Sequence, residues 1–271
     1  MNAPERLPIA DIQALPDNRN VAIDEVGIRG LRYPIRIAGC DGAVQTTVAD
    51  IELTVALPAH VKGTHMSRLV ELIERWDAPL SAANLEQLAR GLLSRLDAEH
   101  GAISLAFPYF IRKRAPVSGV ESLLDYQAGA RVSASATGPA EVTLTLRTAV
   151  TSLCPCSREI SEYGAHNQRS YISIEATLPP SGPDIVLEDL ARIAENAASC
   201  EIWGILKRPD EKYVTERAYD NAKFVEDLVR DVALALNASE SISSYRIEVE
   251  NFESIHNHSA IARIARRKDA A

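Results

Sequence analysis

The feature of this chain that most constrains its fold is an order of strand and helix signals that occurs twice. In the first half, residues 31–39 and 44–58 alternate apolar and polar side chains, which is typical of half-buried strands. Residues 64–76 and 81–98 then place apolar side chains at helical intervals. Strand character returns over residues 102–119 and 123–136. This half therefore reads ββααββ.

The second half repeats the order. It predicts strands over residues 140–153 and 169–179, helices over 186–199 and 222–237, and a last strand or pair of strands over 245–265. No long Ser- or Gly-rich linker separates the halves, so we expect them to pack side by side. The sequence indicates an α+β fold with two tandem ββααββ modules and antiparallel sheets.

We expect an N-terminal tail over residues 1–20, a first module over 21–138 and a second over 139–271. The tail is rich in Pro, Asp and Asn. A sheet with both helices on one face has unpaired edge strands, which invite pairing with another sheet. Assembly of several chains into a closed barrel would remove those edges.

Composition and charge argue against several classes of protein. No apolar run approaches the roughly 20 residues that span a bilayer, and the N-terminus lacks a signal-peptide pattern, so we expect a cytoplasmic protein without membrane contact. The formal charge of −8 argues against nucleic-acid binding. The four cysteines are too few for a disulfide framework in a chain of 271 residues, which leaves metal binding or thiolate chemistry open.

Cys154, Cys156 and His166 lie around a turn-rich segment between two predicted strands. Such a loop can bring a sulfur and an imidazole nitrogen to one cation, but two donors do not make a site. Further donors are available at Asp210 and Glu211, and in "ESIHNHS", which contains Glu253, His256 and His258. On the predicted last strand, His256 and His258 would share a face. A metal site, a buried structural thiol and a loop histidine all remain open.

Glu226 falls outside the apolar stripe of its predicted helix. That stripe consists of Phe224, Val225, Leu228, Val229, Val232 and Leu236. The carboxylate of Glu226 should therefore face solvent or another subunit.

Four motifs together resemble one family. They are "KGTHMSR", "SLCPCSREISEYGAHNQRS", "LKRPDEKYVTERAYDNAKFVEDLVRD" and "NFESIHNHSA", and the resemblance extends from "ADIQALPDNRN" to "NHSAIA". The chain resembles the type IB GTP cyclohydrolase I enzymes. The resemblance implies the tunnelling fold, a homotetramer with active sites between subunits, and conversion of GTP and water to 7,8-dihydroneopterin triphosphate and formate, the first step of pterin and folate synthesis.

The resemblance also implies the site. Cys154, His166, Glu211 and His256 would bind one divalent metal, which is zinc by first expectation, with manganese or iron(II) as alternatives for activity. Cys154 would also belong to the catalytic set through that metal. Glu226 would bind the guanine, whose N1–H and 2-amino group can both donate to one carboxylate.

Other roles follow less directly. His258 and His65 are the imidazoles available for proton transfer. Cations for the triphosphate are Lys62, Arg68, Lys207, Arg208 and Arg169, which the sequence does not rank. Two ligand assignments stay open: Cys156 is the alternative to Cys154 as the thiol ligand, and Asp210 is the alternative to Glu211 as the carboxylate ligand.

Two other functions compete with the cyclohydrolase. A relative of the same fold, the nitrile reductase of queuosine synthesis, uses a cysteine thiolate as nucleophile and needs NADPH. A noncatalytic purine- or pterin-binding protein would use the same ligands to hold a structural metal with no open coordination position.

Overall fold

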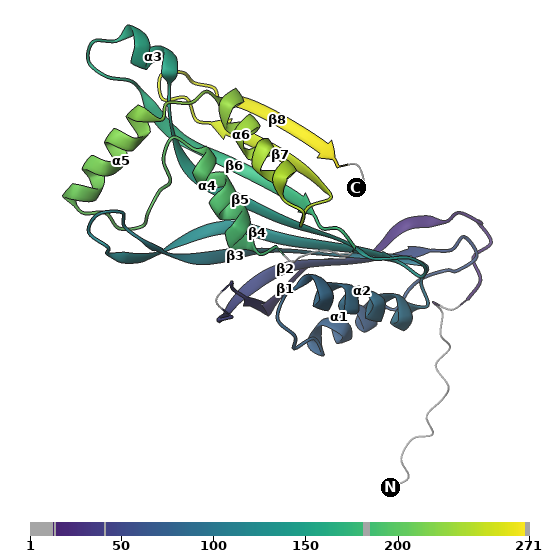
Figure 1. Ribbon diagram of the computed structural model, residues 1–271. Helices are drawn as coiled ribbons and strands as arrows, with labels where there is room; N and C mark the ends of the chain where they lie inside the picture. Colours follow the sequence, from purple (N-terminus) through teal and green to yellow (C-terminus); the bar gives the residue numbers. More distant parts are fainter. Residues whose placement is uncertain (1–12, 14, 41, 181–184, 269–271) are drawn as a thin grey trace.

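Eight strands form one antiparallel sheet in chain order (Figure 1). The computed structural model describes residues 13, 15–40, 42–180 and 185–268. The strands are β1 (Ile23–Ala38), β2 (Val44–Leu57), β3 (His100–Arg114), β4 (Glu121–Ser135), β5 (Glu141–Leu153), β6 (Asn167–Thr177), β7 (Ser244–Asn251) and β8 (Ala260–Arg267). The two halves of the chain meet where β4 pairs with β5, so they share one continuous sheet.

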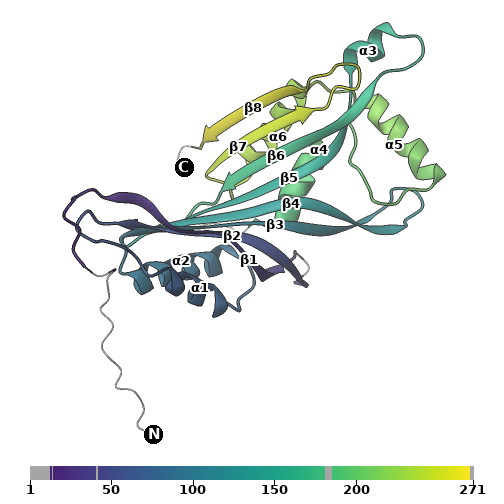
Figure 2. The same ribbon diagram turned by 180° about the vertical axis from the view of Figure 1, so that it is seen from behind.

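Within the described residues, six helices accompany the sheet. They are α1 (Met66–Glu74), α2 (Ala82–Leu96), α3 (Pro155–Ile160), α4 (Leu187–Ala197), α5 (Arg208–Asp220) and α6 (Val225–Ala238). Helices α1 and α2 lie on the first half of the sheet, and α4 and α6 on the second half (Figures 1 and 2). One hydrophobic cluster joins all four helices to the strands, so they cover a common face. None of the helices in the described part of the chain is long and apolar enough to cross a membrane.

The predicted ββααββ order is present in both halves, with two helices added in the second. Ser81 is the N-cap of α2, and its hydroxyl accepts a hydrogen bond from the Asn84 N–H at 3.2 Å. Helices α3 and α5 were not predicted. Helix α5 buries only Asp210 and Ala218, so it carries no apolar stripe that a periodicity argument can detect.

Two apolar residues of these helices lie at the surface, and one of them, Phe224, was predicted to belong to the apolar stripe. Val70 is 39% exposed on α1, because the buried side of that helix consists of Leu69, Leu72 and Ile73. Phe224 is 42% exposed because it is the N-cap of α6 and has not entered the helix. The remaining residues of the predicted α6 stripe are buried.

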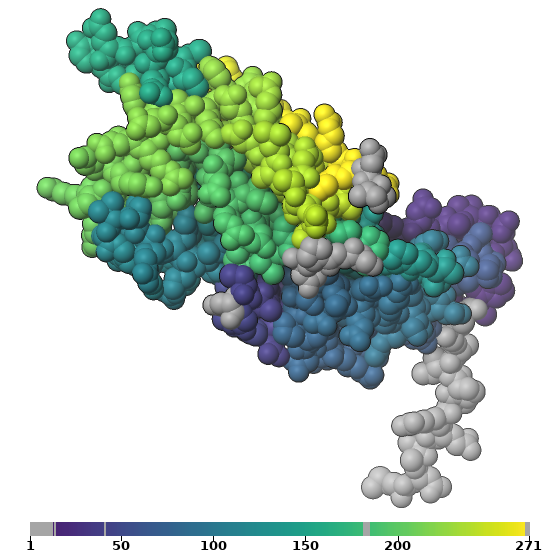
Figure 3. All heavy atoms as spheres, in the orientation of Figure 1, coloured from purple at the N-terminus to yellow at the C-terminus, as the bar shows by residue number. Residues whose placement is uncertain are grey.

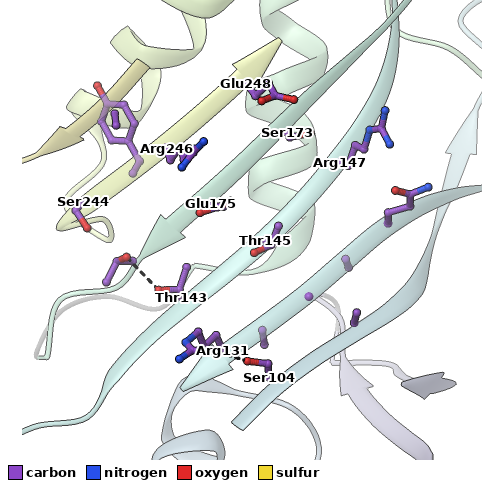
Figure 4. A pocket seen from close by; sticks show the side chains of 18 of the residues that line it. Ser104, Arg131, Thr143, Thr145, Arg147, Ser173, Glu175, Ser244, Arg246 and Glu248 are labelled. Carbon is purple, nitrogen blue, oxygen red and sulfur yellow. Dashed lines mark hydrogen bonds between the residues drawn. The ribbon is translucent and has the colours of Figure 1, made fainter. Parts of the chain in front are cut away.

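The face of the sheet without helices is polar and hollowed. A cavity of about 1020 Å³ lies over β3 to β8 (Figure 4). Its walls include Arg131, Thr145, Arg147, Glu175 and Arg246. A sheet that is apolar toward its helices and charged on the other side keeps that other side in contact with water.

The described part of the N-terminal segment pairs with the chain that enters α1. The Asp17 N–H donates to the His60 carbonyl at 2.9 Å, and the Lys62 N–H donates to the Leu15 carbonyl at 3.2 Å. Residues 1–12 and 14 of the expected tail lie outside the described residues. The pairing fixes the backbone of Lys62, one of the predicted phosphate-binding residues.

A buried ion pair holds α4 against the strands of the first half. Lys113 on β3 and Glu195 on α4 are 2.8 Å apart, with side chains only 10% and 15% exposed. The Tyr126 hydroxyl donates to the same carboxylate at 2.6 Å, and burial followed by the Glu195 charge raises the pKa of Tyr126. The Lys113 ammonium also lies 4.8 Å from the centre of the Trp203 ring, in the segment that leads to α5.

We predict that Lys113→Met lowers the free energy of unfolding by about 3–5 kcal/mol, because Glu195 would remain buried without its partner. The neighbouring pair Arg114–Glu121 provides the control, since its side chains are 73% and 44% exposed. Arg114→Met should cost less than about 1 kcal/mol. Urea unfolding at matched protein concentration measures both, and equal losses would contradict the assignment of a buried network.

Candidate functional site

Cys154 and His166 lie side by side at one end of the sheet. Cys154 follows the last residue of β5 and is the N-cap of α3, while His166 precedes the first residue of β6. The Cys154 N–H donates to the His166 carbonyl at 3.1 Å, which continues the β5–β6 ladder by one step. Antiparallel pairing therefore brings together two residues that are 12 positions apart in the chain.

The connection between them is tied back to the same point. The Ser157 hydroxyl donates to the Cys154 carbonyl at 3.1 Å and accepts from the His166 N–H at 3.2 Å. Gly164 has a φ of 113°, which residues with a β-carbon rarely adopt. The loop itself projects from the end of the molecule (Figure 3), with Tyr163 97% exposed.

One nitrogen of the His166 ring is engaged by the protein. Its Nδ1 lies 3.1 Å from Gln168 Oε1 and 3.4 Å from the Ser254 hydroxyl. Ser254 belongs to the loop between β7 and β8, which also contains His256 and His258. This contact places the second predicted imidazole ligand in a loop that touches the first.

His256 and His258 do not lie on a strand, so that part of the prediction is wrong. Strand β7 ends at Asn251, and β8 begins at Ala260. The two imidazoles are nevertheless adjacent, because their rings stack with centroids 5.1 Å apart and planes at 13°. Both are exposed.

Glu226 lies near the same end of the sheet. It is on the first turn of α6, and the Lys223 N–H just before that helix donates to the Leu153 carbonyl at 3.1 Å. Leu153 is the residue before Cys154. The Glu226 side chain is exposed, as predicted from its position outside the apolar stripe.

Glu211 is separated from this group within one chain. It lies on the first turn of α5, next to the hairpin between β3 and β4, and the other end of α5 lies near α3 (Figure 1). The nine residue steps from Glu211 to Asp220 correspond to about 13 Å along a helix axis. Lys207 and Arg208 share the Glu211 end of the helix.

Asp210 has a structural role, which removes it as an alternative to Glu211. Its carboxylate accepts hydrogen bonds from the N–H groups of Val117, Ser118 and Lys207, each at 2.8 Å, and from the Ser118 hydroxyl at 2.6 Å. Burial alone would raise the pKa of Asp210, but these hydrogen bonds outweigh it and hold the pKa well below its usual value. The interaction fixes the start of α5 against the β3–β4 hairpin.

We predict that Asp210 makes the protein sensitive to acid. A carboxyl whose pKa is depressed in the folded state stabilises fully above its unfolded pKa of about 3.9, and this contribution is lost as pH falls toward the folded pKa. Asp210→Asn should therefore lower the melting temperature at pH 7, and between pH 5 and pH 2 it should lose less further stability than the unsubstituted protein.

The matched control is Asp77→Asn, since the Asp77 side chain is 96% exposed. It should follow the unsubstituted protein at every pH. Parallel melting-temperature curves for the unsubstituted and Asp210→Asn proteins would contradict this role of Asp210.

Three of the predicted cations, Arg169, Lys62 and Arg68, and the proton-transfer candidate His65 divide between the two ends of the sheet. Arg169 is the third residue of β6, close to His166, and its carbonyl accepts from the Phe252 N–H at 3.1 Å. Lys62, His65 and Arg68 lie where β2 leads into α1, at the opposite end of the strands. The Arg68 guanidinium donates to the Arg95 carbonyl at 3.3 Å. Only Arg169 among these four lies beside Cys154 and His166 in one chain.

No group of three or more His, Cys, Asp or Glu side chains within the described ranges is close enough to hold a metal. The fold thus places Cys154 and His166 side by side, brings the loop of His256 into contact with His166, and holds Glu211 at a distance from them.

Cys156 is exposed on α3, whereas Cys154 is half-buried at the end of the ladder. Cys200 is buried, and burial followed by the Glu201 charge raises the pKa of its thiol to about 11.

Residues 9–262 match the family described as Type I GTP cyclohydrolase folE2. The chain is 56% identical over 264 residues to "GTP cyclohydrolase FolE2 1" of Dechloromonas aromatica, covering 97% of this chain and 98% of that one. It is 54% identical over 265 residues to "GTP cyclohydrolase FolE2" of Bordetella petrii, with the same coverage. The chain belongs to the FolE2 family of type I GTP cyclohydrolases.

Solved structures with a similar fold are urate oxidases. A uricase from Bacillus fastidious superposes with a TM-score of 0.56 at 11% sequence identity, covering 93% of this chain and 94% of that one. Urate oxidase from Bacillus sp. TB-90 gives 0.52 at 10% identity, covering 91% of this chain and 100% of that one. At such low identity, this similarity shows a shared fold and nothing further.

Sequence reasoning missed the residues that support the Cys154–His166 pair. Ser157, Gln168 and Ser254 all lie inside the quoted motifs, so their position beside predicted ligands was a usable signal. Two of their contacts were not predictable from local pattern, because Gln168 bonds to Ser152 on another strand and Ser254 bonds to His166 from a loop 88 positions away.

Proposed function

We propose that this chain is a GTP cyclohydrolase I that converts GTP and water to 7,8-dihydroneopterin triphosphate and formate. The observation that carries the proposal is membership of the FolE2 family over nearly the whole chain, with 51–56% identity to relatives of that name. The placement of Cys154, His166 and Glu226 at one end of the sheet supports it.

The donor set fits a divalent metal. Cys154 and His166 are fixed by backbone pairing, and the loop of His256 contacts His166 through Ser254. Thiolate, imidazole and carboxylate together suit zinc, and also admit iron(II) or manganese. A cation held by Cys154, His166, Glu211 and His256 would supply Lewis-acid activation of water for attack at guanine C8.

Glu226 binds the guanine in this proposal. Its exposed carboxylate can accept from the guanine N1–H and the 2-amino group at once, and adenine offers no such pair of donors. The first turn of α6 favours a negative charge, because the helix dipole is positive there. His258, stacked on His256, and His65 are the candidates for moving protons in the later ring-opening and ring-closing steps.

Separation of Glu211 from Cys154 supports a site completed between subunits. The edges β1 and β8 face solvent along most of their length in the described structure, and such edges favour pairing with a further sheet. A homotetramer in which the sheets close into a barrel, as in a tunnelling fold, would use both edges. In that arrangement a second subunit supplies Glu211 to the cation.

The same assembly would deliver cations for the triphosphate. Lys207 and Arg208 lie within four residues of Glu211, and both side chains are exposed. A subunit that contributes Glu211 therefore brings these two positive charges with it. Lys62 and Arg68 would come from a first module, and Arg169 from the subunit that holds Cys154.

The two competing functions gain no support from the relatives. The matched proteins carry the cyclohydrolase name rather than that of a nitrile reductase or a binding protein. We place this GTP-binding enzyme in the cytoplasm, as the sequence predicts.

We predict that Cys154→Ala loses the bound metal and lowers turnover of GTP by more than about 100-fold, since changes next to a ligand alone cost about 10–100-fold. Cys156→Ala is the matched control and should retain both. Metal content by mass spectrometry and formate release measure the two properties. Full metal content in Cys154→Ala would overturn the assignment of this thiol.

We predict that Glu226→Gln keeps its metal and lowers kcat/KM for GTP by about 100-fold or more, since each hydrogen bond to a charged group contributes about 1.5–3 kcal/mol. It should also lose the preference for GTP over inosine triphosphate, which lacks the 2-amino group. Glu240→Gln, after the end of α6, serves as the control and should behave as the unsubstituted enzyme. Loss of metal from Glu226→Gln would place Glu226 among the ligands instead.

A further inference from the structure

A buried chain of hydrogen bonds leads away from His166 into the sheet. Gln168 Oε1 lies 3.1 Å from His166 Nδ1, and Gln168 Nε2 donates to the Ser152 hydroxyl at 3.1 Å. The Ser152 and Ser170 hydroxyls are 2.7 Å apart. Gln168 is 8% exposed, and both serines are completely buried. Beyond His166, this row of hydrogen bonds is therefore almost completely shielded from bulk water.

Strand pairing makes this arrangement rigid. Ser152 on β5 and Gln168 on β6 are direct neighbours across the ladder, and Ser170 follows Gln168 on the same face. Both strands are central in the sheet, so neither can shift without breaking its other neighbour. The amide of Gln168 is therefore held by two strands rather than by a loop.

The orientation of that amide determines which nitrogen of His166 carries the proton. An amide oxygen against Nδ1 requires a proton on Nδ1, and a neutral imidazole then has its lone pair on Nε2. The opposite amide orientation would place an N–H group against Nδ1 and put the ring proton on Nε2. Only the first tautomer leaves Nε2 able to bind a cation.

Two observations favour the first tautomer. The Gln168 amide oxygen faces His166 Nδ1, and the amide nitrogen on the other side donates to the Ser152 hydroxyl. The Ser254 hydroxyl is a second possible acceptor at the same Nδ1, at 3.4 Å. Within the described residues no hydrogen bond to Nε2 is present, so that nitrogen is the one available to a ligand.

We propose that Gln168, anchored by Ser152 and Ser170, is a positioning residue that holds His166 in the Nδ1–H tautomer and so makes Nε2 its metal-binding atom. The proposal rests on the proposed function for the metal itself. The assignment of the tautomer does not depend on the metal, because the contacts that fix it lie within the metal-free protein. Residues that hold a ligand imidazole in this way usually affect metal affinity by about 10–100-fold.

The first test is the tautomer of His166 in metal-free full-length protein labelled with 15N-histidine. Two-bond proton–nitrogen correlation spectra distinguish the tautomers, and His166→Ala identifies the signal. We expect Nδ1–H in the unsubstituted protein and a mixture in Gln168→Leu. A proton on Nε2 in the unsubstituted protein would overturn the proposal without any variant having to fold.

The second test is zinc affinity, measured by competition with a chromogenic chelator. Gln168→Leu should bind zinc about 10–100-fold more weakly, and Gln168→Glu, which retains an acceptor, should recover most of that loss. Gln45→Leu is the matched control, because the Gln45 amide also makes two hydrogen bonds, both to Phe110, on a distant strand. It should leave zinc affinity unchanged.

The outcomes separate the two proposals. Unchanged tautomer and zinc affinity in a folded Gln168→Leu would contradict the role of Gln168 while leaving the metal site intact. Failure of the unsubstituted protein to bind zinc, manganese or iron(II) would contradict the proposed metal site, and the tautomer spectrum would still decide the role of Gln168.

Discussion

The pairing of β5 with β6 is the interaction on which the candidate site depends. The ladder runs from Thr143 opposite Thr177 to Leu153 opposite Asn167, and the next step is the bond between the Cys154 N–H and the His166 carbonyl. A shift of this register by one residue would turn Gln168 and Ser170 to the polar face and separate the thiol from the imidazole. The relative position of Cys154 and His166 is thus set by backbone hydrogen bonds in the middle of the sheet.

The second constraint is the direction of α5. Asp210 fixes the first turn of this helix to the β3–β4 hairpin, and the helix then runs toward α3. Glu211, Lys207 and Arg208 are therefore held away from Cys154 in the same chain. The buried Lys113–Glu195 pair and the Trp203 ring support the segment that carries the helix to this position. This separation is the observation behind the proposed site between subunits.

Much of the fold was predictable because its strands and four of its helices have one apolar side. The alternation in β5 shows directly which of its side chains are buried. The same holds for the apolar stripe of α2, which consists of Leu85, Leu88, Leu92 and Leu93. Helix α5 escaped prediction because it packs on little apolar surface. The loop of His256 and His258 was mistaken for strand, since the apolar residues that flank it continue the alternation. Phe224 has the spacing of a core residue, and only its place before the first helical turn explains its exposure.

The candidate site was predictable as a set of residue types, not as a geometry. Resemblance supplied Cys154, His166, Glu211, His256 and Glu226, and spacing alone left a structural thiol open. Asp210 and Glu211 are indistinguishable in sequence, yet the four hydrogen bonds to Asp210 commit it to the fold. Contacts that join residues from different strands, such as Gln168 with Ser152, are invisible to any local pattern.

The central claim is that this chain is a metal-dependent GTP cyclohydrolase I. The most direct test is GTP turnover by protein that has been stripped with a chelator and reloaded separately with zinc, manganese and iron(II). Formate release and pterin fluorescence after oxidation report the two products. The account predicts that both products appear together and only after a metal is restored. A folded, metal-loaded protein that forms neither product with any of the three metals would contradict it.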